Sequence, residues 1–86
     1  MKHLENVLKA LANRRRLAIL KYLKGIKEAP VWDIAGEIKL SFKSTSKHLG
    51  KLAAADLVEK DQRGLQIFYR LSKNPPLSAR HLISLL

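Results

Sequence analysis

Apolar residues recur every three or four positions along much of the chain, which is the spacing of amphipathic helices. The first stripe predicts a helix over residues 3–12 and consists of Leu4, Val7, Leu8 and Leu11. A second stripe follows Asn13, a residue type that caps helix starts, and consists of Leu17, Ile19, Leu20 and Leu23. Gly25 is predicted to end this second helix, because glycine readily adopts the left-handed conformation found after helix C-termini.

The middle of the chain shows two short helical patterns separated by a tight turn. Residues 26–30 are interpreted as a connector, and residues 31–38 predict a third helix. Ser41 is a favourable N-cap for a fourth helix, which extends to about Ala55. Two helices of this length, joined by only a few residues, are typical of a helix-turn-helix.

The last third of the chain changes from helical to strand-like alternation. Residues 57–62 and 65–71 predict a β-hairpin with Arg63 and Gly64 at its turn. Two prolines in the following linker prevent any regular element from continuing, and Ser78 is predicted to cap a last helix that reaches Leu86. The predicted fold is therefore mainly α with a small β-hairpin wing, a winged helix-turn-helix formed by one domain over residues 1–86.

Charge is the unusual part of the composition. The 86 residues include 17 Lys and Arg but only 7 Asp and Glu, which gives a formal net charge of +10. Such a balance favours polyanionic partners, with nucleic acid first and an anionic membrane surface second. The apolar runs are too short to span a bilayer, no signal peptide is recognisable, and the absence of cysteine excludes disulfides and fits a cytoplasmic protein.

The fourth predicted helix carries no acidic residue from Ser41 through Ala55. Lysines and serines on its outer side fit DNA, because short hydroxyls approach base edges and lysines reach guanine or phosphate. A merely solvated helix face is the alternative. The residues expected to contact double-stranded DNA from this helix are Ser41, Phe42, Lys43, Ser44, Ser46, Lys47 and Lys51.

Other basic and polar residues extend this expected DNA-contacting surface. Arg14 and Arg15 open the second helix, where a bound phosphate would offset the unfavourable helix dipole. The alternative is a solvated basic turn in which Arg16 pairs with Glu5 or another acid. At the hairpin turn, the expected contacts to DNA come from Gln62, Arg63 and Gln66. Arg70 is a further candidate for the DNA backbone.

The roles of two aromatic residues and one histidine, Phe42, Trp32 and His48, are interpreted from their positions in the predicted helices. Phe42 either packs against the turn or contacts a thymine methyl group, and packing is the preferred interpretation. His48 is interpreted as a structural hydrogen-bonding residue and Trp32 as a core or dimer-contact side chain.

These segments together resemble the ArsR-type winged-helix transcription regulators. The resemblance rests on residues 8–23 (LKALANRRRLAILKYL), 31–58 (VWDIAGEIKLSFKSTSKHLGKLAAADLV) and 63–71 (RGLQIFYRL). It implies that the helix capped by Ser41 enters the major groove, that the hairpin touches flanking DNA, and that the outermost helices form a symmetric dimer. Asn13 and Arg14 replace the usual Asp-Pro of the family at the start of the second helix.

The terminal helices, residues 1–12 and 77–86, are thus expected to join two copies of the chain. Their apolar stripes exceed what so small a core can cover, which also favours a homodimer. The expected interface residues are Leu4, Val7, Leu8, Leu11, Leu82, Ile83 and Leu86.

Metal sensing is not expected, and neither is a cofactor. The family's Cys-x-Cys pair would fall where this chain has VWDIA, and only His81 is present on the last helix, where zinc-sensing relatives place several ligands. A pair of His3 and His81 across the dimer is the one remaining metal possibility. No effector can be named.

An enzymatic function finds no support, because the three histidines are scattered and no Ser or carboxylate completes a catalytic spacing. The expected function is a DNA-binding transcriptional regulator, a repressor that reads a palindrome as a homodimer. The alternatives are a winged-helix module for protein–protein contact and a protein that coats DNA without sequence preference.

Overall fold

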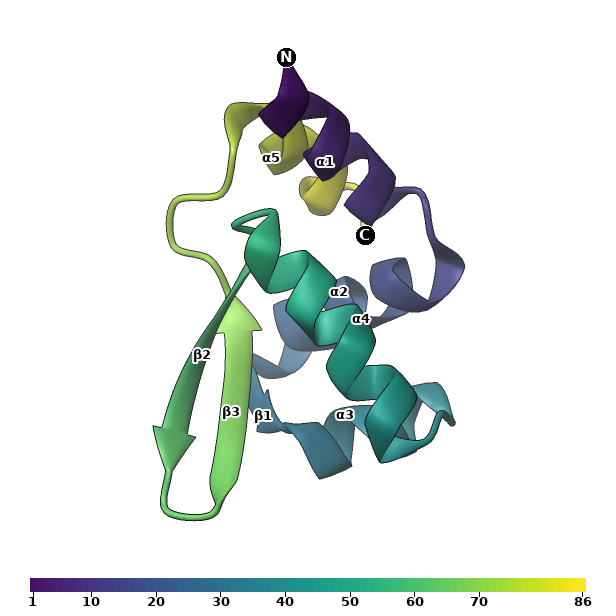
Figure 1. Ribbon diagram of the computed structural model, residues 1–86, viewed down its shortest axis with the longest axis vertical. Helices are drawn as coiled ribbons and strands as arrows, with labels where there is room; N and C mark the ends of the chain where they lie inside the picture. Colours follow the sequence, from purple (N-terminus) through teal and green to yellow (C-terminus); the bar gives the residue numbers. More distant parts are fainter.

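The computed structural model describes residues 1–86 as five helices and a three-stranded sheet (Figure 1). In chain order the elements are α1 (Lys2–Leu11), α2 (Arg14–Ile26), β1 (Glu28–Pro30), α3 (Val31–Ile38), α4 (Phe42–Ala54), β2 (Val58–Arg63), β3 (Gln66–Leu71) and α5 (Leu77–Ser84). The helix-turn-helix of α3 and α4 is followed by the β2–β3 hairpin. The predicted winged helix-turn-helix is therefore confirmed.

Two of the predicted helix caps form as expected. The side chain of Asn13 accepts a hydrogen bond from the backbone N–H of Arg16 at 3.1 Å, and Ser41 Oγ accepts one from the N–H of Ser44 at 3.1 Å. Each bond satisfies an amide that the first helical turn leaves without a partner. These local contacts fix where α2 and α4 begin.

Four boundaries differ from the prediction. α2 continues through Gly25 to Ile26, and Lys27 takes the positive φ of 81° that ends the helix. The expected cap by Ser78 is wrong, because the N-cap of α5 is Pro76, two residues earlier, whose carbonyl accepts from the amides of Ala79 and Arg80. This helix ends at Ser84 and not at Leu86. In the hairpin, Arg63 still belongs to β2, and Gly64 at φ 65° forms the turn with the residue after it.

The segment predicted as a connector contains a strand. β1 pairs antiparallel with β3, which places Glu28 opposite Arg70 and Pro30 opposite Phe68. The sheet order is β1-β3-β2, so β3 is the central strand. A strand of three residues leaves little local pattern, and its partner lies about forty residues further along the chain, so no local signal marks it.

The core lies between the inner face of the sheet and the helices. Its fully buried side chains come from α1, α2, α3, α4 and the loop before β2, and include Val7, Ile19, Leu20, Leu23, Ile34, Leu49, Leu52 and Leu57. α1 and α5 lie next to each other at the opposite end of the molecule from the wing turn (Figure 1). None of the five helices combines the length and the apolar character needed to cross a membrane.

The stripes expected to form the dimer interface divide between core and surface. Val7, Leu11 and Ile83 are buried within the protomer, and Leu86 is half-buried. Leu4 and Leu8 remain exposed. The further exposed leucines of this end, all on or next to α5, are Leu77, Leu82 and Leu85.

Candidate nucleic-acid interface

The outer face of α4 is cationic. Thr45, Leu49 and Leu52 are buried, and at about 100° per residue Lys43 and Lys47 lie on the opposite side of the helix, where both are exposed. Ser46 is half-buried on the side of α4 that faces the wing, where it lines a cavity together with hairpin residues. Lys51 lies on the other side and lines a cavity shared with α1 and α2.

The first turn of α4 leaves a positive helix end without any acidic residue to balance it. Ser41, Lys43 and Ser44 surround this end, with Ser44 half-buried and the other two exposed. Free backbone amides at a helix start and a neighbouring lysine together attract anions such as phosphate. The arrangement brings together the cations and hydroxyls that the sequence predicted for this helix.

The start of α2 is tied to the end of α3. Arg14 is exposed, and Arg15 Nη1 donates a hydrogen bond of 3.3 Å to the carbonyl of Ile38, directly before the turn that leads into α4. Arg15 therefore lies beside the helix-turn-helix, and its hydrogen bond to Ile38 joins α2 to the end of α3. The predicted phosphate contacts of Arg14 and Arg15 remain predictions.

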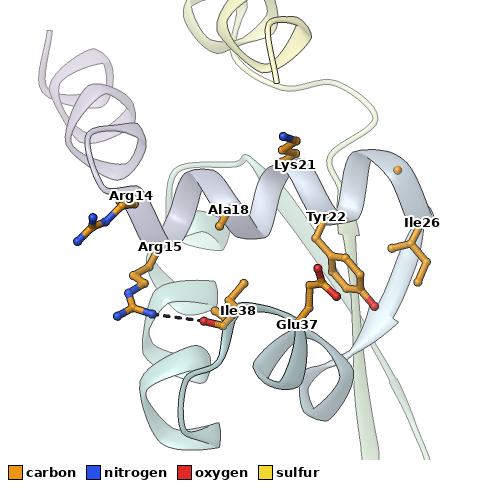
Figure 2. A pocket seen from close by; sticks show the side chains of 9 residues that line it. Arg14, Arg15, Ala18, Lys21, Tyr22, Ile26, Glu37 and Ile38 are labelled. Atoms are coloured by element: carbon orange, nitrogen blue, oxygen red, sulfur yellow. Dashed lines mark hydrogen bonds between the residues drawn. The ribbon is translucent and has the colours of Figure 1, made fainter.

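The largest concave surface lies between α2 and α3 and has a volume of about 1020 Å³ (Figure 2). Tyr22 and Glu37 point toward each other across it, whereas Lys21 points away from α3. Burial, followed by the charges of Asp33 and Glu37, raises the pKa of Tyr22. The hydroxyl therefore stays protonated at neutral pH and can donate a hydrogen bond.

Arg16 connects α1 to α4, and this connection was not predicted. Its Nε donates to the carbonyl of Ala10 at 2.7 Å, and its Nη2 donates to the carbonyl of Lys9 at 3.1 Å. Its Nη1 donates to Nδ1 of His48 at 3.2 Å, since a guanidinium can only donate. The alternative considered for Arg16, a pairing with Glu5 or another acid, is therefore not what the structure shows. We call these three bonds the Arg16 clamp.

The clamp requires a neutral His48. Burial, followed by the positive charges of Arg16, Lys51 and Arg15, lowers the pKa of His48 below its usual value. The unprotonated Nδ1 then accepts from Arg16, which agrees with the predicted structural role of this histidine. A sequence signal for Arg16 exists, because it lies three and four residues before Ile19 and Leu20, on the buried stripe of α2.

The wing holds its arginines in ion pairs. Arg63 Nη1 and Nη2 donate to the two carboxylate oxygens of Glu28 at 2.7 and 3.0 Å, and Arg63 Nε donates to Asp61 at 3.0 Å. The guanidinium also lies 4.4 Å from the centre of the Phe68 ring. Arg70 is likewise paired, with Glu59 at 3.3 Å.

These ion pairs change what the wing can offer to DNA. In the free protein, Arg63 is engaged by two carboxylates, so a phosphate would have to displace them. The side chains of Arg63 and Glu28 are both more than a third exposed, so their ion pair contributes little free energy and a phosphate can replace the carboxylate at little cost. Gln62 and Gln66 are exposed near the turn, where Gln62 Nε2 donates to the carbonyl of Gly64 at 3.4 Å.

The interpretation of Trp32 as a core residue is wrong. Its side chain is 65% exposed and packs against Phe42, with the ring centroids 4.6 Å apart. Phe42 is itself 41% exposed, so it packs as preferred but keeps an open surface. Trp32 is the second residue of α3, one position after the buried Val31 and two before the buried Ile34, so at about 100° per residue it lies to the side of the face that packs on the core.

The histidines outside the clamp are separate. His3 lies 3.8 Å from a carboxylate oxygen of Asp56, and His81 is exposed on α5. No three His, Cys, Asp or Glu side chains lie close enough together to hold a metal ion.

Comparison with known proteins places this geometry in a family. Residues 13–60 match the family described as bacterial regulatory protein, arsR family. HlyU from Vibrio cholerae N16961 is 32% identical and superposes with a TM-score of 0.81, covering 98% of this chain and 87% of its own. No curated protein sequence matches this chain.

Two further structures are similar. The homodimeric winged helix-turn-helix DNA-binding domain of Mb0332 from Mycobacterium bovis, a possible ArsR-family transcriptional regulator, is 32% identical at a TM-score of 0.82, covering 98% of this chain and 74% of its own. The AntR antimony-specific transcriptional repressor is 28% identical at a TM-score of 0.77, covering 92% and 68%. With its helix-turn-helix, wing and family match, this chain belongs to the arsR family of bacterial regulatory proteins, which are DNA-binding transcriptional regulators and not enzymes.

Proposed function

We propose that this protein acts in the cytoplasm as a homodimer that binds a palindromic site in double-stranded DNA and represses the promoter that contains the site. The observation that carries the proposal is the exposed, acid-free outer face of α4, which presents Lys43 and Lys47 within a winged helix-turn-helix. In such folds this helix enters the major groove. Mb0332, a homodimeric DNA-binding domain, and AntR, a repressor, support the same assignment.

The residues of α4 divide by what they would touch. Lys43 and Ser44, near the start of the helix, would reach base edges, because the first turns of a recognition helix lie deepest in the groove. Lys47, Lys51 and Arg14 would contact phosphates. Contacts to phosphate fix register and affinity, whereas contacts to bases carry the sequence preference.

The exposed leucines at the α1–α5 end support the homodimer. Leu4 and Leu8 of α1 and Leu82 of α5 lie in water in the single chain, together with two more leucines of the same end. Covering them with a second copy gains hydrophobic free energy that the small core cannot provide alone. A two-fold axis through this end would leave both α4 helices free to contact DNA.

Selection of bound sites from random duplex DNA tests the DNA-binding proposal. We expect enrichment of a palindrome whose half-sites are separated by about 10 bp, the distance of one DNA turn. Lys43→Ala should relax the preference at particular base pairs by about 1–3 kcal/mol. Lys47→Ala should weaken all sequences equally and lower the salt slope by about one.

Lys2→Ala is the matched control, because it removes the same charge from the exposed start of α1. Binding without any enriched sequence would contradict the operator proposal and indicate a protein that coats DNA. No binding to duplex DNA at low salt would contradict the function itself and leave a protein–protein module.

Analytical ultracentrifugation tests the dimer. The wild-type protein should sediment as a dimer at micromolar concentration, and Leu8→Glu combined with Leu82→Glu should give a monomer or aggregate. A wild-type monomer under these conditions would contradict the homodimer.

A further inference from the structure

Two aromatic side chains lie exposed at the starts of the two helices of the helix-turn-helix. Trp32 in α3 and Phe42 in α4 pack with their ring planes tilted by 41°, and together they leave a broad apolar surface in water. We call this pair the aromatic ledge. Aromatic side chains usually bury most of their surface, and exposed apolar patches on small proteins mark interaction sites.

The ledge borders a gap between α4 and the wing. A cavity of about 200 Å³ lies there, lined by Val31, Ser46 and Ile67 in addition to the ledge. Leu65, in the wing turn, forms the opposite rim with its side chain fully exposed. An apolar surface therefore extends from the first turn of α4 to the wing turn, as the position of α3 beside the hairpin allows (Figure 1).

The charges around the ledge indicate what covers it. Lys43 follows Phe42 directly, and no acidic residue occurs between Ser41 and Ala55. Asp61 of the wing and Glu28 of β1 are engaged by Arg63, and Asp33, next to Trp32, is the exposed acid on the α3 side of the ledge. The α4 side of the ledge, around Phe42, is therefore cationic, which favours an anionic partner that presents an apolar group at the start of α4.

The major groove of DNA combines both properties. Phosphates flank it, and thymine presents a C5-methyl group on its floor. We propose that the aromatic ledge contacts thymine methyl groups, with Phe42 touching the methyl and Trp32 positioning the Phe42 ring. This inference rests on the proposed function, because it requires that α4 enters the groove.

The chemistry of Phe42 makes the contact selective. Cytosine carries only a hydrogen at C5, where thymine carries its methyl group, so cytosine at the same position would lose the apolar contact with the phenyl ring. Thymine loses nothing when its methyl group is covered. We therefore expect the preferred DNA site to contain thymine in each half-site at the position that faces the start of α4.

Substitution of deoxyuridine for thymidine tests the contact directly, since it removes only the methyl group. The probe is the duplex selected by the wild-type protein, with its thymines replaced one at a time, and affinity is measured by fluorescence anisotropy. For a thymine that faces Phe42, we expect affinity to fall about fourfold, the ratio that corresponds to one buried methyl group. Phe42→Ala should bind the thymine and uracil duplexes equally.

Ile26→Ala is the matched control, because Ile26 is 45% exposed but lies at the end of α2, and it should keep the fourfold ratio. Trp32 is the only tryptophan in the chain, so its emission reports the ledge without a label. We expect a blue shift or quenching when DNA saturates the protein.

The failures of the two proposals are distinguishable. Specific DNA binding in which no thymine-to-uracil change alters affinity would overturn the ledge contact and leave the proposed function intact. Unchanged Trp32 emission in the saturated complex would also overturn it, and would leave the ledge free for a protein partner. No affinity for any duplex would overturn both proposals.

Discussion

Replacing Arg16 with methionine should destabilise the fold by removing the C-terminal cap of α1. An α-helix leaves its last four carbonyls without intrahelical partners. In α1 the carbonyls of Leu8 and Leu11 accept from backbone amides, at 2.9 and 2.8 Å, while those of Lys9 and Ala10 accept from Arg16. Arg16→Met leaves the Lys9 and Ala10 carbonyls without their donor.

The magnitude follows from the burial of the two carbonyls. Ala10 is buried, so its carbonyl loses its partner without gaining water, which costs about 1–3 kcal/mol. Lys9 is exposed and water can hydrate its carbonyl, so losing the hydrogen bond from Arg16 to this carbonyl costs free energy at the low end of the same range. Methionine recovers part of this cost, because the buried guanidinium has no carboxylate partner to offset its desolvation. The expected net loss is about 2 kcal/mol.

Urea denaturation followed by circular dichroism measures this loss. With an m-value of about 1 kcal/mol/M, the midpoint should fall by about 2 M. Arg14→Met is the matched control, because Arg14 is exposed and its loss should change the unfolding free energy by less than about 0.5 kcal/mol. Protein concentration must be equal in all samples, because the proposed dimerisation would make the midpoint depend on concentration. Equal midpoints for the two variants would refute the capping role of Arg16.

Three further predictions concern single side chains. The lowered pKa of His48 means that its stabilising contribution is complete above about pH 6.5 and is lost as pH falls below that value through the folded-state pKa. His48→Asn keeps an acceptor but does not titrate, so the decline of unfolding free energy between pH 7 and 5 should flatten; an equally steep decline would exclude His48 as its source. Glu28→Gln should release Arg63 to phosphate and raise DNA affinity a few-fold with a salt slope steeper by about one, and an unchanged slope would mean that Arg63 does not reach DNA. Thr45→Val should raise the unfolding free energy by about 1 kcal/mol in urea titrations, because the buried Thr45 hydroxyl has no hydrogen-bond partner, and a loss of stability would indicate a partner for it.

The elements that the sequence predicted well are those that depend on local interactions. The caps at Asn13 and Ser41 act within three residues, and apolar periodicity places Leu49 and Leu52 on the inner side of α4. The hairpin likewise depends on adjacent segments and a glycine turn. Such signals survive in the sequence because both partners are close along the chain.

The sequence erred where a residue's partner is distant. The sequence pattern alone predicts Arg63 as an unpaired cation at the wing turn. In the structure, the three-stranded sheet brings Glu28, 35 residues away in the sequence, into an ion pair with Arg63. Trp32 has the large apolar side chain typical of a core residue, but its position in α3 places that side chain against Phe42 and in solvent. Neither outcome is visible before the sheet and the helix-turn-helix are assembled.

The sequence by itself determined the class of fold, the order of its helices and wing, and the cationic character of the fourth helix, because helical periodicity, capping and charge are properties of short segments. Only the tertiary structure decided which leucines of α1 and α5 stay exposed, since burial depends on which helices pack together. It also decided that Arg16 joins α1 to α4, because a buried guanidinium takes whichever carbonyls and nitrogen the packing brings within reach.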